Sequence, residues 1–167
     1  MKHAIRLLSV LSAVLVGILT APSPAAAITG PGSYGCATDT IAATKINGVT
    51  YTATEKTCVE ILPNLSARTH GVTRCYRSGA PFNCLIINGD TVEAILWVDG
   101  AITAGTRQDD RDCSNCHENS HYSTTVPCLA GSRETFLGDE ANLRVAWAPG
   151  VISAPHGHSS NPVTLDC

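Results

Sequence analysis

Eight cysteines narrow the range of folds open to this chain. An even number of cysteines behind an export leader is typical of a disulfide framework, because oxidised sulfur persists outside the cytosol. The chain has two Trp, two Phe and four Tyr among 167 residues, so bridges worth roughly 2 to 4 kcal/mol each would offset a modest apolar core. The cysteines are Cys36, Cys58, Cys75, Cys84, Cys113, Cys116, Cys128 and Cys167.

The N-terminal segment predicts a removable signal peptide. Lys2 and Arg6 give a basic start, and residues 7–20 form an uncharged apolar run that is too short to span a bilayer comfortably. Residues 25–27 are three alanines, which offer the small-x-small pattern that a signal peptidase cleaves. We place the cut after Ala27 and expect residues 28–167 to form a single secreted, extracellular domain without a membrane span.

The charge balance argues against nucleic acid as a partner. The chain carries 14 Asp and Glu against 11 Lys and Arg, for a formal net charge of −3. Two of the basic residues belong to the leader, so the remaining domain is more acidic still. A surface of this sign repels phosphate backbones.

Residue periodicity predicts an all-β domain. Residues 48–62 read as one long strand or two short ones, and residues 71–106 as a meander of about four strands in which Ile95 and Trp97 face the core. Strand character returns at residues 121–126 and 142–148. Seven or eight short strands favour a disulfide-stapled antiparallel β-sandwich, with a small β-barrel as the alternative.

Two turn sequences organise the meander. Asp99-Gly100 is a strong hairpin signal, since both positions tolerate positive φ. Residues 78–81, Ser-Gly-Ala-Pro, favour chain reversal. A symmetric turn there would place Arg77 opposite Phe82 and Cys75 opposite Cys84, close enough for a disulfide. Order alone suggests a second bridge between Cys36 and Cys58, and the pairing of the remaining four cysteines (Cys113, Cys116, Cys128 and Cys167) stays open.

Residues 107–120 form a long polar segment that carries two cysteines. A connection of this length in a compact domain is either functional or covalently pinned. We expect it to be the contact surface of the domain. The candidate contact residues are Asp109, Asp110, Asp112, His117 and Glu118, and the four acids are also possible calcium ligands.

The same segment contains Cys113-Ser114-Asn115-Cys116-His117, which matches Cys-x-x-Cys-His. These five residues resemble the haem attachment sequence of c-type cytochromes. The resemblance implies haem c, with thioether bonds to both cysteines and His117 as an iron ligand. The only methionine, Met1, lies in the leader, so a second axial ligand would come from His70, His121, His156 or His158.

A metal reading of the segment is a second alternative. Cys113, Cys116, His117 and His121 offer thiolate and imidazole ligands at spacings that suit zinc, although export disfavours reduced sulfur. The chain has no Gly-x-Ser-x-Gly and no His-Glu-x-x-His motif, so no catalytic residue can be nominated.

The sequence therefore favours a secreted binding module without catalytic activity or cofactor, whose partner is an unknown extracellular protein or cell-surface polymer. A c-type haem electron-transfer protein and a small extracellular hydrolase are the alternatives.

Overall fold

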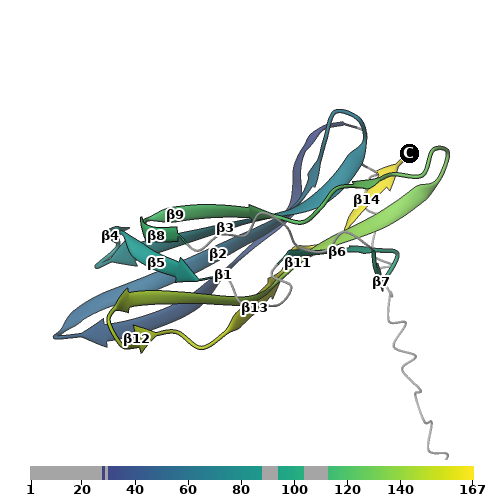
Figure 1. The fold of residues 1–167 in the computed structure, drawn as a ribbon. Helices are drawn as coiled ribbons and strands as arrows, with labels where there is room; N and C mark the ends of the chain where they lie inside the picture. Colours follow the sequence, from purple (N-terminus) through teal and green to yellow (C-terminus); the bar gives the residue numbers. More distant parts are fainter. Residues whose placement is uncertain (1–27, 29, 88–93, 104–112) are drawn as a thin grey trace, which may run out of the picture.

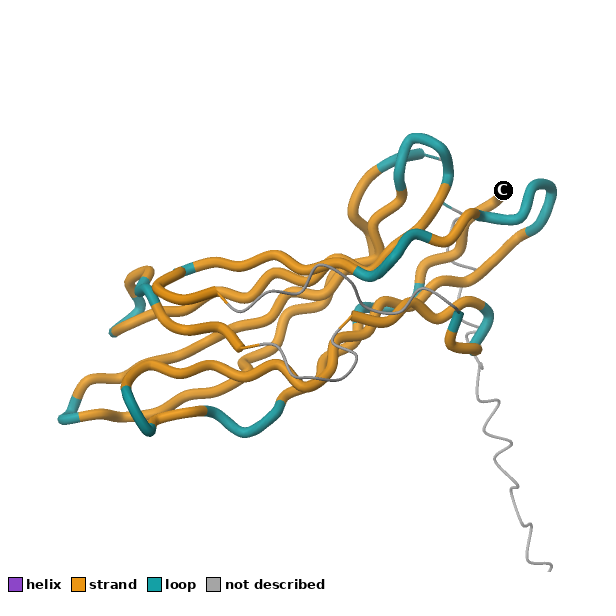
Figure 2. The backbone as a smooth tube through the Cα atoms, in the orientation of Figure 1, coloured by secondary structure: helices purple, strands orange, loops and turns teal. Residues whose placement is uncertain are grey.

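The computed structural model describes residues 28, 30–87, 94–103 and 113–167. Within these ranges the chain consists of β-strands and the turns that join them, with no helix (Figures 1 and 2). The strands form two antiparallel sheets that pack as a sandwich, and neither sheet closes into a barrel among the described strands. No helix in the described ranges is long and apolar enough to cross a membrane.

The first sheet is built around two long hairpin strands. Asn47 and Gly48, with φ of 49° and 81°, join them in a tight turn that needs left-handed backbone at both positions. The first strand of this hairpin was not recognised in the sequence. The sheet contains β1 (Gly32–Ile46), β2 (Val49–Ile61), β3 (Ser66–Arg77), β4 (Ala80–Pro81), β9 (Glu118–Tyr122) and β10 (Val126–Pro127).

The second sheet is organised by one long strand, β11 (Arg133–Ala148), with partners along both edges. The strands β6 and β5 both pair with β11, and β7 and β8 pair with β6 and β5 respectively. Three short C-terminal strands, β12, β13 and β14, also pair with β11. The shorter strands are β5 (Cys84–Ile87), β6 (Ala94–Val98), β7 (Ala101–Ile102), β8 (Cys113–Cys116), β12 (Val151–Ile152), β13 (His156–Ser159) and β14 (Val163–Asp166).

The predicted meander over residues 71–106 is wrong. The strands β3 and β5 lie in different sheets, and β5 and β6 both pair with β11 instead of with each other. The reason is local: Ser78 and Gly79, with φ of 50° and 82°, form a two-residue turn. Arg77 therefore lies opposite Ala80, and the chain leaves the first sheet after Phe82. The Asp99-Gly100 hairpin is present, with φ of 48° and 79°, and joins β6 to β7.

The predicted orientation of β6 is also wrong. Ala94 and Leu96 are fully buried, whereas Ile95 and Trp97 are half-buried on the opposite face. Successive side chains of a strand point to opposite faces, and in β6 the side chains of both faces are apolar. The alternation of residues therefore could not show which face of β6 points into the core.

Three disulfides are described, and two of them tie the sheets together. Cys75 on β3 is bonded to Cys84 on β5, and Cys128, which follows β10, is bonded to the C-terminal Cys167 after β14. The third, Cys36–Cys58, joins β1 to β2 within the first sheet. Cys116 is disulfide-bonded as well. Such bridges are consistent with an extracellular protein.

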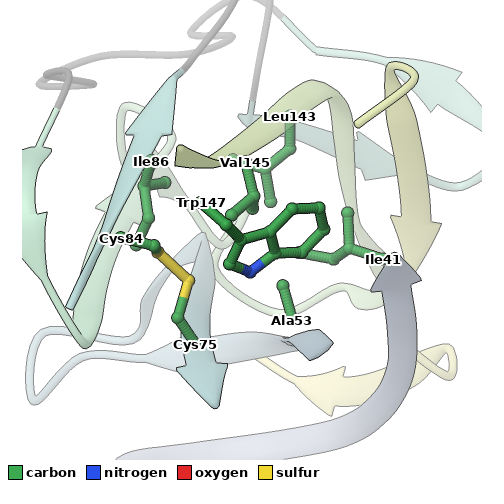
Figure 3. Close-up of a cluster of buried hydrophobic side chains, with 8 residues drawn as sticks. All are labelled: Ile41, Ala53, Cys75, Cys84, Ile86, Leu143, Val145 and Trp147. Carbon is green, nitrogen blue, oxygen red and sulfur yellow. A yellow bond between two sulfur atoms is a disulfide. The ribbon is translucent and has the colours of Figure 1, made fainter. Parts of the chain in front are cut away.

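The sandwich interior contains two separate apolar clusters. The first core lies at the end of the molecule that holds β4, β5 and β12, where the Cys75–Cys84 bridge packs beside Trp147 (Figures 1 and 3). The second core lies at the end that holds β6, β7 and β14. The first core comprises Ile41, Ala53, Cys75, Cys84, Ile86, Leu143, Val145 and Trp147, and the second comprises Val59, Ile61, Ala67, Leu96, Phe136, Val163 and Leu165.

Candidate functional site

The middle of the interior, between the two cores, is polar. On β2, β3 and β11 the inward positions change from apolar to polar or glycine and back to apolar as each strand passes from one core to the other. We call the residues of this stretch the polar centre. They are Glu55, Thr57, Thr69, Gly71, Thr73, His121, Gly138 and Glu140, all of them buried.

Three titratable side chains meet in the polar centre. His121 on β9 and Glu55 on β2 come from the first sheet, and Glu140 on β11 comes from the second. The Nε2 atom of His121 lies 3.2 Å from Oε1 of Glu55 and 3.5 Å from Oε2 of Glu140. All three residues are at most 2% exposed. The cluster therefore links the sheets through one imidazole and two carboxylates out of contact with solvent.

A glycine creates the space for this cluster. Gly71 on β3 lies directly opposite His121 on β9 and opposite Thr57 on β2. A Cβ atom at this position would lie 2.5 Å from Cδ2 of His121 and 2.6 Å from Oε1 of Glu140. The His121 imidazole and the Glu140 carboxylate thus occupy the volume that the side chain of any other residue type at position 71 would fill.

Hydroxyl groups surround the cluster. The Thr73 hydroxyl donates a hydrogen bond of 2.5 Å to Oε2 of Glu55, which leaves Oε1 directed toward His121. Two buried polar atoms, Oγ1 of Thr57 and Nδ1 of His121, have no hydrogen-bond partner among the described residues. A buried polar group without a partner costs free energy, so a ligand that engaged these atoms would recover part of that cost.

The polar centre contains more acidic than basic side chains. The buried titratable side chains of the described residues are Glu55, Glu140 and His121, with no Lys or Arg among them. Two carboxyl groups thus face one imidazole away from solvent. Buried charge is tolerated only when it is paired, neutralised or bound to a metal.

A second candidate site is a groove on the outer face of the second sheet. Ala146 on β11 lies between Leu85 on β5 and Ile152 on β12 in the strand register. The small side chains of Ala146 and Ala148 leave a hollow between the larger Leu85 and Ile152. The groove encloses about 410 Å³ and is lined by Asn83, Cys84, Leu85, Asn115, Ala146, Trp147, Ala148, Pro149, Gly150 and Ile152.

The predicted contact segment, residues 107–120, is placed only in part. Asp109, Asp110 and Asp112 lie outside the described residues. From Cys113 onward the segment is not a loop, because β8 and most of β9 occupy it. His117 is exposed, and its carbonyl accepts a hydrogen bond from the amide of Cys75.

The acidic residue Glu118 belongs to an ion pair. Its carboxylate lies 2.7 Å from Nε of Arg74, directly across the β3–β9 pair. The hydrogen bond that Arg74 donates to Glu118 raises the pKa of Arg74. Both side chains are more than one-third exposed, and exposed pairs of this kind contribute little to stability.

The predicted zinc ligands point in different directions. His121 faces the polar centre, whereas His117 is exposed, and Cys116 is disulfide-bonded. A disulfide at Cys116 also leaves no thiol there for a haem thioether. Of the histidines considered as a second haem ligand, His70 stacks on Tyr122 with ring centroids 4.5 Å apart, and burial lowers its pKa. His156 and His158 lie near Asp39 on the surface between β1 and β13.

In the sequence, His121 was recognised only as a possible zinc or haem ligand, and neither Glu55 nor Glu140 was recognised. A signal for Glu55 was present: it shares the inward alternation of Val59 and Ile61, so an acid stood in an apolar row. Glu140 was hidden by a β-bulge. Asn142 has a φ of 63°, and the register shifts between Glu140 and Leu143, so inward residues are even-numbered before the bulge and odd-numbered after it.

Compared with known proteins, the chain matches no family model, no curated protein and no solved structure.

Proposed function

We propose that this chain is an exported, disulfide-stapled β-sandwich that acts as a non-catalytic binding module, with the groove beside Ala146 as its contact surface. The signal-peptide pattern of residues 1–27 and the disulfides support secretion. The observation that carries the binding role is the groove itself, an apolar hollow on a stapled frame.

The groove favours an apolar partner. Its side chains are apolar or small except for two amides, Asn83 and Asn115, and it has no charged residue among those that line it. Its volume is within the range of pockets that accept organic groups. Ile152 at its edge is 54% exposed. We infer that the groove receives apolar side chains of an extracellular protein, with the amides as hydrogen-bonding groups at the rim.

The frame around the groove is suited to this role. Cys84, which lines it, is bonded to Cys75 on the opposite sheet, and Asn115 lies between two cysteines of the predicted contact segment. Loops and strand ends held by covalent links lose little conformational entropy on binding. Among the described residues of the predicted contact segment, Asn115 lines the groove.

The test is a peptide-display selection against the immobilised mature protein, residues 28–167. Selected peptides are expected to carry large apolar residues and to lose most of their binding to Ala146→Arg, which fills the hollow. Ile102→Asp is the matched control, because Ile102 is also 54% exposed but lies in β7 at the other end of the sandwich. Equal binding to Ala146→Arg, or no apolar peptide selected, would contradict the proposal.

The two alternatives are tested with the same preparation. A reduced absorption spectrum with haem bands would favour the c-type electron-transfer protein. Hydrolysis of generic ester, peptide or glycoside substrates would favour the hydrolase. The binding module predicts neither signal.

A further inference from the structure

We propose that the polar centre is a buried site for one divalent metal ion of the zinc class, held by Glu55, His121 and Glu140. This site is separate from the groove and does not depend on the binding role. Its function is structural: the ion would join the two sheets at the level where neither apolar core reaches.

The distances between the three side chains suit a shared ion. Zn²⁺ binds imidazole nitrogen and carboxylate oxygen at about 2.0 to 2.2 Å, so two ligands of a tetrahedral ion stand about 3.3 Å apart. The observed separations from Nε2 of His121 are 3.2 Å to Glu55 and 3.5 Å to Glu140. One ligand atom from each of the three residues lies within 4.8 Å of the other two.

The ligand set selects the class of metal. Ca²⁺ and Mg²⁺ prefer shells made of oxygen alone, whereas imidazole with carboxylates suits Zn²⁺, Mn²⁺, Fe²⁺ or Co²⁺. No thiolate is required, so the site is compatible with an oxidised, exported protein. This distinguishes it from the alternative zinc site of Cys113, Cys116, His117 and His121, which would need reduced sulfur.

A divalent ion would be compatible with the charges of its three ligands. Two ionised carboxylates, one neutral imidazole and one doubly charged cation sum to zero net charge. Buried ions are tolerated when their charges are balanced at close range.

The surroundings are built as a metal site requires. The Thr73 hydroxyl holds one oxygen of Glu55 and thereby orients the other, as outer hydrogen bonds do for metal-binding carboxylates. Gly71 keeps the backbone of β3 clear of the imidazole. Thr57 lies across Gly71 from His121 in the register, and its buried hydroxyl has no hydrogen-bond partner among the described residues, so it is the candidate for a fourth ligand.

Because the site is enclosed, the ion would enter during folding. The experiment therefore unfolds the mature, disulfide-intact protein in denaturant with a chelator and refolds it with or without Zn²⁺. Refolding with Zn²⁺ is expected to give one tightly retained equivalent by elemental analysis after desalting. At a hundredfold excess over the dissociation constant, the Tm is expected to rise by about 8 °C relative to the chelated protein.

A surface site must be separated from the buried one. Asp39, His156 and His158 also lie close enough to bind an ion. The double variant His156→Ala/His158→Ala is expected to keep the retained equivalent and the shift in Tm. His121→Asn is expected to lose both.

A spectroscopic readout keeps the test independent of variant folding. Co²⁺-loaded protein with both surface histidines replaced is expected to show the visible absorption of a four-coordinate nitrogen and oxygen site, without a sulfur charge-transfer band. The proposal would be overturned if the refolded protein retained no metal, if the Tm were the same with Zn²⁺ and with chelator, or if removing the surface histidines abolished all binding.

Discussion

The two ends of the sandwich interior and its middle are stabilised in different ways. The first and second cores are apolar, and the second is centred on fully buried Phe136 and Leu165. Between them, the polar centre places two carboxylates and an imidazole where hydrocarbon would normally lie. Apolar burial is non-directional, so the two cores require only side chains of compatible shape. The polar centre instead depends on particular hydrogen-bonding and charged partners.

A chain poor in aromatic residues thus stabilises its interior both by apolar packing and by polar contacts. Each sheet contributes to both apolar ends, and among the described residues Glu140 of the second sheet contacts His121 of the first sheet in the middle. Truncating an apolar side chain at either end should lower the free energy of unfolding by its lost transfer free energy plus the cost of the cavity. Removing one polar partner in the middle should lower it by the desolvation penalty of the buried polar groups left without a hydrogen bond.

The largest effect is expected at the second core. Phe136→Ala removes a fully buried ring and should lower the free energy of unfolding by about 3 to 5 kcal/mol, measured by denaturant titration. Ile102→Ala, at an exposed position, is the control and should change it by about 0.5 kcal/mol or less. Equal effects would show that the second core is not packed as described.

Removal of the bridge between the sheets should have the next largest effect. Cys75→Ser/Cys84→Ser opens a disulfide with a sequence separation of nine residues and should cost roughly 2 to 4 kcal/mol. The loss should appear at the first core, where this bridge packs near Trp147 (Figure 3). Trp147 fluorescence should therefore change, and an unchanged midpoint of unfolding would argue against this pairing.

A single methyl group should distinguish the middle from the ends. Gly71→Ala places a Cβ against His121 and Glu140, and overpacking of this kind costs about 1 to 3 kcal/mol. Gly30→Ala is the matched control, because nothing lies within 4 Å of its added Cβ. A destabilisation at Gly30 as large as that at Gly71 would contradict the proposed crowding.

The smallest effect concerns pH and the outer face of the first sheet. Burial lowers the pKa of His70 below its ordinary value of 6.5, so the unfolded chain takes up a proton first as the pH falls. Stability should therefore decrease as the pH falls below 6.5, until the folded protein also binds the proton. His70→Gln should reduce this decrease, measured as Tm against pH, and exposed His117→Gln should leave it unchanged.

Much of the fold could be predicted from the sequence, because alternating apolar residues and turn sequences can be recognised over short stretches of chain. These patterns predicted the all-β class, the antiparallel sandwich and the Asp99-Gly100 hairpin. The distribution of strands between the sheets could not be predicted, because β5 and β6 both pair with β11, some 40 to 60 residues further along the chain. The prediction of the inward face of β6 was wrong because both faces of this strand are apolar.

The candidate site was less accessible to sequence reasoning. The cluster unites Glu55, His121 and Glu140 from three distant strands, and no short motif records such a meeting. One acid in an apolar row pointed to Glu55, whereas the bulge at Asn142 hid Glu140. The groove depends on Ala146 and Ala148, and an alanine in a strand indicates a hollow only when the larger residues on the neighbouring strands are known.

The most direct test of the polar centre is diffraction from crystals of the Zn²⁺-refolded protein, collected on both sides of the zinc absorption edge. We expect one strong anomalous peak between β2, β9 and β11, in contact with Glu55, His121 and Glu140. If the imidazole of His121 contacts both carboxylates directly with no anomalous peak there, the centre is a proton-linked triad and the metal site does not exist.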